Sequence, residues 1–285
     1  AWWAHQLTQP MLLRKLDKDR CASALTRTLT ETTMPADQIP QGTGRLYKDL
    51  AEWWQLMSPP EEYEEEAAFY ASLLLKDLAE GSEPTLLELG SGGGNNASFL
   101  KRHFQLTLVD PAAGMLAHSR KLNPEAVHLE GDMRTLRTGR EYDRVFVHDA
   151  IMYMTTQRDL KRAMETAFVH CRRGGVALFA PDYVKETFHP GTECGGADGE
   201  AGGFRYLEWS WDPDPTDTTY VVYYAYLLRS PDGVVQIEED RHVEGVFPRE
   251  VWLRLLKEVG FEAEVVPFDH SEVERDLEVF LARKP

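Results

Sequence analysis

The middle of the chain alternates between two hydrophobic patterns. Short runs that are apolar almost throughout predict buried strands, and most are followed by a stretch with apolar residues at helical spacing. The expected strands cover residues 85–89, 106–110, 127–129, 144–148 and 176–180, and the expected helices cover 97–103, 112–121 and 158–171. Apolar strands that alternate with helices are typical of an α/β, doubly wound parallel sheet. Ligands bind such sheets beyond the carboxyl ends of the strands, so the residues after each strand carry most of the functional information.

Beyond residue 190 the pattern changes. Residues 191–203 are rich in glycine and acidic residues and predict a mobile loop. Three runs that alternate aromatic and polar residues, joined by turns with proline and aspartate, predict antiparallel hairpins over 204–211, 220–229 and 234–244. A helix over 248–259 and strands over 262–267 and 276–281 then return to the α/β pattern.

Upstream of the first strand the expected elements are helical. Apolar residues recur at helical period over 46–57 and 63–78, and Ser58-Pro59-Pro60 separates these stretches because proline interrupts a helix. Residues before 46 indicate a marginal helix and a linker. We therefore expect four parts: an N-terminal helical extension and linker (1–45), a core (46–190), an inserted lid of antiparallel strands (191–245) and the C-terminal part of the core fold (246–285).

The charge of the chain argues against a nucleic-acid partner. Its 285 residues include 31 Lys and Arg against 47 Asp and Glu, a formal net charge of −16, whereas a protein that binds a phosphate backbone needs a basic face. No apolar run reaches the ~18 residues of a membrane span. The first residues lack the basic and apolar segments of a signal peptide, and three widely spaced cysteines indicate neither a disulfide framework nor a metal site. We therefore expect a cytoplasmic protein without metal, nucleic-acid or membrane partners.

The densest chemical signal follows the first expected strand. Glu88-Leu89-Gly90-Ser91-Gly92-Gly93-Gly94 places glycines, which allow positive φ and close approach of a ligand, before a helix whose first N–H groups point into the site. Dinucleotide-binding folds share such a turn, and Asp110 ends the second strand about 20 residues on, where those folds bind ribose. Two features argue against a dinucleotide. Asn95 stands where that motif has its third glycine, and a second acidic turn, Glu130-Gly131-Asp132-Met133-Arg134, follows the third strand.

These segments resemble a known family. Glu88-Leu-Gly90-Ser-Gly92-Gly-Gly94, Val109-Asp110, Gly131-Asp132-Met133 and Arg173-Gly174-Gly175-Val176 stand in the order and spacing of class I S-adenosylmethionine-dependent methyltransferases. More narrowly, Tyr63-Glu-Glu-Glu66-Ala67, Met115-Leu-Ala-His118-Ser-Arg120, Gly131-Asp-Met-Arg134 and Glu186-Thr-Phe188 resemble the sugar N,N-dimethyltransferases of macrolide pathways, with glycine N-methyltransferase a more distant relative. The resemblance runs from about residue 46 to residue 186. It implies a Rossmann-like sheet, mostly parallel with an antiparallel last strand, that binds S-adenosylmethionine and methylates a small-molecule acceptor.

The resemblance also implies roles for residues of the cofactor site. Gly90 and Gly92 would bring the backbone against the methionine portion of the cofactor, and Glu88 would orient the loop. Asp110 would accept hydrogen bonds from both ribose hydroxyls. The Ser58-Pro59-Pro60 segment lacks the arginine that many relatives pair with the cofactor carboxylate.

The adenine end of the cofactor would contact four further residues. Pro111 and Met115 would pack on the ring, and Asp132 with Met133 would hold its amino edge. Simple core filling is the alternative role for each of the two methionines.

The acceptor is expected beyond the fourth strand, where the chain reads His148-Asp149-Ala150-Ile151-Met152-Tyr153. A base is needed only if the attacking atom arrives protonated. His148 or Asp149 could accept that proton, and Asp149 could instead hold an ammonium or hydroxyl group. The resemblance places Tyr153 near the transferred methyl, His148 also on the cofactor side, and Tyr47 and Trp54 over the cofactor. A purely structural hydrogen bond for His148 and a wall position for Tyr153 stay open as alternatives.

Aromatic residues crowd the inserted strands. They are Trp209, Trp211, Tyr220, Tyr223, Tyr224 and Tyr226. Alternation sends some of them inward, where they would cover an apolar or cationic acceptor, or pack a lid or the subunit interface of a homodimer. We expect the acceptor group to be an amine or a hydroxyl, and the sequence does not decide between nitrogen, oxygen and carbon as the attacking atom. A dinucleotide-dependent oxidoreductase and a non-catalytic binding protein on the same fold stay open as alternative functions.

Overall fold

The computed structural model describes residues 44–79, 81–200, 202–271 and 276–285. These residues belong to one compact unit, Gln41–Pro285. The helical extension and linker expected over 1–45 lie, except for the last two residues, outside the described residues.

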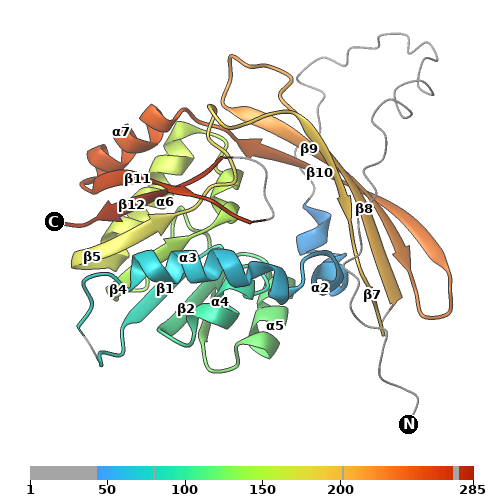
Figure 1. The fold of residues 1–285 in the computed structure, drawn as a ribbon, viewed down its shortest axis with the longest axis horizontal. Helices are drawn as coiled ribbons and strands as arrows, with labels where there is room; N and C mark the ends of the chain where they lie inside the picture. Colours follow the sequence, from blue (N-terminus) through green and yellow to red (C-terminus); the bar gives the residue numbers. More distant parts are fainter. Residues whose placement is uncertain (1–43, 80, 201, 272–275) are drawn as a thin grey trace. The chain divides into compact units, whose positions relative to one another are not determined.

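Seven strands of the described chain form the central sheet, in the order β11-β12-β5-β4-β1-β2-β3 (Figure 1). They are β1 (Thr85–Leu89), β2 (Gln105–Asp110), β3 (Val127–Glu130), β4 (Tyr142–Val147), β5 (Cys171–Phe179), β11 (Glu262–Phe268) and β12 (Leu277–Arg283). The pairs among β1 to β5 are parallel, and β12 runs antiparallel to β5 and β11. The expected Rossmann-like sheet with an antiparallel last strand is confirmed. Its order reverses at β1 and β4, where sheets of this kind bind ligands.

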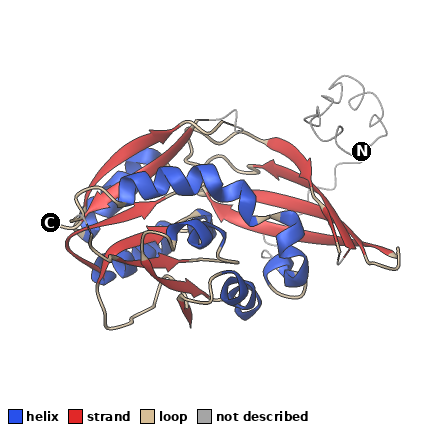
Figure 2. Ribbon diagram, turned by 60° about the horizontal axis from the view of Figure 1, so that its bottom comes forward, coloured by secondary structure: helices blue, strands red, loops and turns tan. Residues whose placement is uncertain are grey.

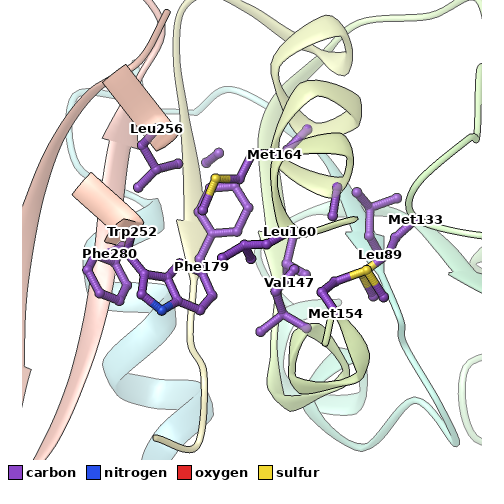
Figure 3. Packing of buried hydrophobic residues seen from close by; sticks show 14 of the residues in the cluster. Leu89, Met133, Val147, Met154, Leu160, Met164, Phe179, Trp252, Leu256 and Phe280 are labelled. Atoms are coloured by element: carbon purple, nitrogen blue, oxygen red, sulfur yellow. The ribbon is translucent and has the colours of Figure 1, made fainter. Parts of the chain in front are cut away.

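Helices cover both faces of this sheet (Figure 2). They are α3 (Glu64–Leu74), α4 (Asn95–Leu100), α5 (Ala113–Leu122), α6 (Gln157–His170) and α7 (Arg249–Val259). Leu89 and Phe179 belong to a core with α6 and α7, in which Trp252 stacks on Phe280 (Figure 3). Leu86 and its neighbours on the other face pack against α3 and α4. Burial on both faces explains why these strands are apolar over much of their length.

The inserted strands form a second, five-stranded antiparallel sheet, with the path β10-β9-β8-β6 and β7 paired to β8. Its members are β6 (Gly191–Gly195), β7 (Asp198–Gly199), β8 (Gly202–Trp211), β9 (Thr219–Arg229) and β10 (Val235–Gly245). The loop expected over 191–203 is therefore wrong for most of its length. Strands pair through their backbone N–H and C=O groups, and glycine has both. Position 195 also favours glycine, because a Cβ there would lie 2.9 Å from the ring of Tyr206 on β8. The glycine makes room for the aromatic ring that covers it.

The first described residues form short helical turns, not the single helix expected over 46–57. These turns are η2 (Arg45–Tyr47), η3 (Ala51–Trp53), α2 (Trp54–Met57) and η4 (Pro60–Tyr63). Leu46 and Leu50 are buried in a cluster with Phe204 and Tyr226 of the second sheet. The segment thus follows the inner face of that sheet, and tertiary packing overrides its helical period.

The helix expected over 63–78 is shorter than its pattern suggests. It begins as α3 at Glu64 and ends at Leu74. The buried guanidinium of Arg144 on β4 donates to the carbonyl oxygens of Leu74 at 2.5 Å and Lys76 at 2.7 Å. These bonds satisfy carbonyls that the end of the helix leaves without partners.

Candidate active site

The glycine-rich loop lies at the carboxyl edge of the sheet, between β1 and α4. The N–H groups of Gly90 and Ser91 donate to the carbonyl oxygen of Val109 on β2, at 2.7 and 2.9 Å. Gly90 has φ +81°, and a Cβ there would lie 2.4 Å from the Cβ of Ala150. Only glycine fits this position, because both the backbone angle and the space exclude a side chain.

Asp110 ends β2 beside this loop. Its carboxylate accepts hydrogen bonds from the N–H groups of Gly92 at 2.9 Å and Ala112 at 2.8 Å. Burial raises the pKa of this carboxyl, and the two N–H donors offset the rise only in part. Each oxygen keeps a lone pair beyond its backbone partner, so the residue retains the acceptor capacity that the expected ribose contact requires.

The residues expected around the adenine surround the same loop. The Sδ-methyl carbon of Met115 lies 3.8 Å from the Cβ position of Gly92, and that of Met133 lies 2.9 Å from the Cβ position of Gly90. Met133 is also part of the main core. Pro111 is exposed.

Asp132 lies in the turn after β3 and is engaged by its own neighbour. Arg134 donates to both carboxylate oxygens of Asp132, with Nη2 at 2.5 Å from Oδ2 and Nε at 3.0 Å from Oδ1. The Arg134 guanidinium lowers the pKa of this carboxyl, which stays an acceptor. The expected contact of Asp132 with an amino group therefore has to share the carboxylate with Arg134.

Buried polar atoms without partners gather at this loop. Trp54 Nε1, Glu88 Oε2, Ser91 Oγ and Asn96 Oδ1 are all buried and have no hydrogen-bond partner among the described residues. The Trp54 indole packs on Gly93, where a Cβ would lie 2.4 Å from Nε1. Buried polar atoms are normally satisfied. This group of donors and acceptors, beside Asp110, fits a polar ligand of the S-adenosylmethionine type.

Glu88 is the carboxyl at the centre of the group. It is 2% exposed, and burial, with smaller contributions from neighbouring carboxylates, raises its pKa to about 8. Glu88 is therefore mostly protonated near neutral pH, and its carboxyl can donate a hydrogen bond as well as accept one.

His148 follows β4 and lies between two carboxylates. Its Nε2 is 3.4 Å from Glu66 Oε1, and its Nδ1 is 3.3 Å from Asp149 Oδ1. Asn96 also donates to Glu66 Oε1, at 2.8 Å. Burial lowers the pKa of His148, but Glu66 and Asp149 outweigh burial and raise it well above the usual value. A raised pKa favours the charged ring and argues against His148 as a base, so its expected role as a proton acceptor stays a prediction.

Asp149 stays ionised beside that ring. Burial raises its pKa, but His148 outweighs burial and lowers it below the usual value. Its side chain is 44% exposed. A carboxylate with a lowered pKa is a weak base but a good partner for a cation.

Tyr153 belongs to η5 (Asp149–Tyr153) and joins a hydrogen-bond chain that the sequence analysis missed. Its hydroxyl donates to the hydroxyl of Tyr47 at 3.0 Å and lies 2.7 Å from Nδ1 of His242 on β10. The other ring nitrogen of His242 lies 3.1 Å from Asp240 Oδ2. The sequence did contain one signal for this hydrogen-bond chain. Side chains alternate between the two faces of a strand, so Asp240, His242 and Glu244 share one face of β10.

The aromatic residues of the inserted strands divide between two faces. Tyr220 and Tyr226 are buried, and the ring of Tyr224 lies 5.1 Å from that of His242. Trp209, at 57% exposed, lies with Tyr223 on the outer face. Only the first group is in a position to cover an acceptor.

A small cavity of about 90 Å³ adjoins His148. Its lining combines carboxyl groups and rings from α3, β11, β12 and the segments that follow β5 and β11: Glu66, Tyr70, Asp182, Phe268, His270 and Glu278. Within the described ranges no helix is long and apolar enough to cross a membrane, and no cluster of metal-ligating side chains is found there.

Comparison with known proteins agrees with this site. Residues 86–175 match the model of a family described as a methyltransferase domain. The chain is 29% identical to the dTDP-3-amino-3,6-dideoxy-alpha-D-glucopyranose N,N-dimethyltransferase of Streptomyces fradiae, over 77% of this chain and 86% of that protein. It is 31% identical to the dTDP-3-amino-3,4,6-trideoxy-alpha-D-glucopyranose N,N-dimethyltransferase of Streptomyces venezuelae, over 46% of this chain and 55% of that protein.

The fold is shared with a solved structure as well. The crystal structure of DesVI from Streptomyces venezuelae superposes with a TM-score of 0.72 at 21% identity, over 83% of this chain and 99% of that one. Neither the oxidoreductase nor the binding-protein alternative receives support. The motifs, the fold and the relatives together support an S-adenosylmethionine-dependent methyltransferase that is similar to the sugar N,N-dimethyltransferases.

Proposed function

We propose that the chain methylates the amine nitrogen of a small amino sugar, free or linked to a nucleotide. One observation carries the choice of nitrogen over oxygen. His148, the candidate base beyond β4, lies between the carboxylates of Glu66 and Asp149, and its pKa is raised well above the usual value. A hydroxyl acceptor needs a base to remove its proton, whereas a neutral amine attacks with its own lone pair. The names of the two Streptomyces relatives, which refer to amino sugars, support the same substrate class.

The residues of the glycine-rich loop would hold the cofactor. S-adenosylmethionine, when bound, supplies a methyl group on a positively charged sulfur. Its polar parts would be bound by Glu88, Gly90, Gly92 and Asp110. The rest of the cofactor would be enclosed by Tyr47, Trp54, Pro111, Met115, Asp132, Met133 and His148. The buried unpartnered atoms at this loop support the assignment.

The residues beyond β4 would hold the acceptor. The hydroxyl groups of Tyr153 and Tyr47 are hydrogen-bonded to each other. Asp149, four residues before Tyr153 in the same short helix, has a partly exposed carboxylate. Carboxylates near a pocket attract cationic substrates, so the ammonium form binds first and gives its proton to water before the neutral amine attacks. Positioning alone supplies about 7–11 kcal/mol toward such a displacement, so the site has no need of a strong base.

We also propose that the second sheet acts as a lid. β10 packs against η5, and α2 packs against β8, so the sheet borders both the expected cofactor and acceptor residues. The division of the chain at residues 46, 191 and 246 stays a proposal of the same kind. A cytoplasmic location and a homodimer stay predictions, which fluorescence imaging in cells and light scattering would check.

The test is an acceptor panel with S-adenosylmethionine, followed by mass spectrometry. The panel pairs amino sugars, as nucleotides and as free sugars, with the analogues that carry a hydroxyl in place of the amine. We expect methylated products from amines alone. Methylation of the hydroxyl analogues at a similar rate would contradict the proposal, and no turnover of any amino sugar would remove it.

A further inference from the structure

The hydrogen-bond chain behind Tyr153 has a defined direction. Asp240 Oδ2 accepts from the backbone N–H of Leu46 at 3.0 Å and lies 3.1 Å from His242 Nε2. An ionised carboxylate only accepts, so Nε2 is the donor. Tyr153 donates its one hydroxyl hydrogen to the hydroxyl oxygen of Tyr47. When Tyr153 donates to Tyr47, Nδ1 of His242 donates to Tyr153 across their 2.7 Å contact, and the ring then carries a hydrogen on each nitrogen.

The surroundings of His242 agree with a charged ring. His242 is 2% exposed. Besides Asp240, the same strand presents Glu244, whose Oε1 lies 3.8 Å from Nδ1. The other elements around it contribute tyrosines: Tyr153 from η5, Tyr47 from η2 at 5.7 Å between rings, and Tyr224 from β9. Burial lowers the pKa of His242, but Asp240 and Glu244 outweigh burial and raise it to about 9.

Loss of the proton from Nδ1 of His242 reverses the donor and acceptor roles along this chain of hydrogen bonds. A neutral ring that donates through Nε2 to Asp240 can only accept at Nδ1. Tyr153 then donates to His242, and Tyr47 donates to Tyr153. In the charged state the Tyr47 hydrogen is free to point away from Tyr153, and in the neutral state only oxygen lone pairs of Tyr47 face outward.

We propose that His242, held by Asp240, is a positioning residue that sets the direction of the hydrogen bonds through Tyr153 and Tyr47, and that the neutral ring favours methyl transfer. This proposal rests on an amine acceptor beside the two tyrosines. A Tyr47 hydrogen that points outward competes for the amine lone pair, which must face the methyl group. A Tyr47 lone pair instead accepts an N–H of the amine and leaves the nitrogen lone pair available.

The test follows turnover against pH in variants that move the His242 proton. In the wild type, kcat rises about tenfold per pH unit below the His242 midpoint and levels off above it. Asp240→Asn removes a carboxylate that favours the charged ring, so the rise shifts to lower pH. His242→Asn keeps a polar group near Tyr153 but does not titrate, so it loses this part of the profile. Glu239→Gln is the matched control, because it removes an exposed carboxylate next to Asp240 on the same strand.

A second readout does not depend on turnover. NMR titration of ¹³C-labelled histidine, with His242 assigned by its loss in His242→Asn, gives the midpoint of the ring directly. We expect a midpoint near 9 that falls in Asp240→Asn and is unchanged in Glu239→Gln. If Asp240→Asn does not fold, Glu244→Gln serves the same purpose. Affinity for S-adenosylhomocysteine, measured by calorimetry, should stay within about twofold in all variants.

The outcomes separate this inference from the proposed function. A kcat profile that stays in place while the NMR midpoint moves overturns the positioning role. If the wild type methylates no amine, the proposed function is wrong. The hydrogen-bond chain can still be tested in that case, by the Tyr153→Phe variant. That variant should shift the His242 midpoint, and an unchanged midpoint overturns the inference.

Discussion

Replacement of Glu88 by glutamine should stabilise the free protein at alkaline pH. The folded state holds the Glu88 proton more tightly than the unfolded chain, because burial raises the pKa from 4.5 to about 8. The free energy of unfolding therefore falls as the pH rises between these two values, and the loss is complete above the higher one. At ~1.4 kcal/mol per pH unit, the full effect is about 5 kcal/mol, of which about 3 kcal/mol falls between pH ~6 and pH ~9. Glutamine has nearly the same shape and no proton to lose.

Urea unfolding of the cofactor-free protein at these two pH values measures the effect. The wild type should lose about 3 kcal/mol more between them than Glu88→Gln does. Glu52→Gln is the control, because Glu52 is exposed on η3 and the same replacement is made there away from the buried loop. Parallel behaviour of the wild type and Glu88→Gln would refute the assignment of a protonated, buried Glu88.

Three further changes test other parts of the structure. Asp110→Ala should weaken binding of S-adenosylhomocysteine by about 1.5–3 kcal/mol in calorimetry, since it removes a charged acceptor, and unchanged affinity would exclude Asp110 from the cofactor site. Tyr153→Phe should lower kcat about tenfold and spare that affinity, while Trp209→Phe on the outer face should change neither. Arg144→Met should lower the free energy of unfolding by about 3 kcal/mol, because the buried guanidinium holds three backbone carbonyls. A chemical-denaturation midpoint equal to that of the wild type would contradict this last role.

The central sheet was predictable because its strands are buried on both faces. Residues such as Leu86 and Leu87 point to opposite cores, so the run is mostly apolar and stands out from the helices around it. The glycine-rich loop and Asp110 were predictable for a related reason. They follow strands directly, and the order of parallel strands brings their carboxyl ends to one edge.

The rest of the site depends on contacts that local periodicity does not contain. Tyr153 and His242 are 89 positions apart, and the turn that brings Tyr47 to them is fixed by packing on the second sheet. The charge of His148 depends on Glu66, which arrives from α3. The prediction missed the glycine-rich strands β6 and β7 for another reason. Their pairing uses backbone atoms, so it does not produce a pattern of apolar and polar side chains.

The central claim is methyl transfer from S-adenosylmethionine to an amine nitrogen. Its most direct test is a reaction with S-adenosylmethionine that carries ¹³C in the transferred methyl, an amino sugar as acceptor, and NMR of the product. The account predicts a labelled carbon bonded to nitrogen, whose chemical shift responds to titration of the amine. A label bonded to oxygen or carbon, or no labelled product from any amino sugar, would contradict it.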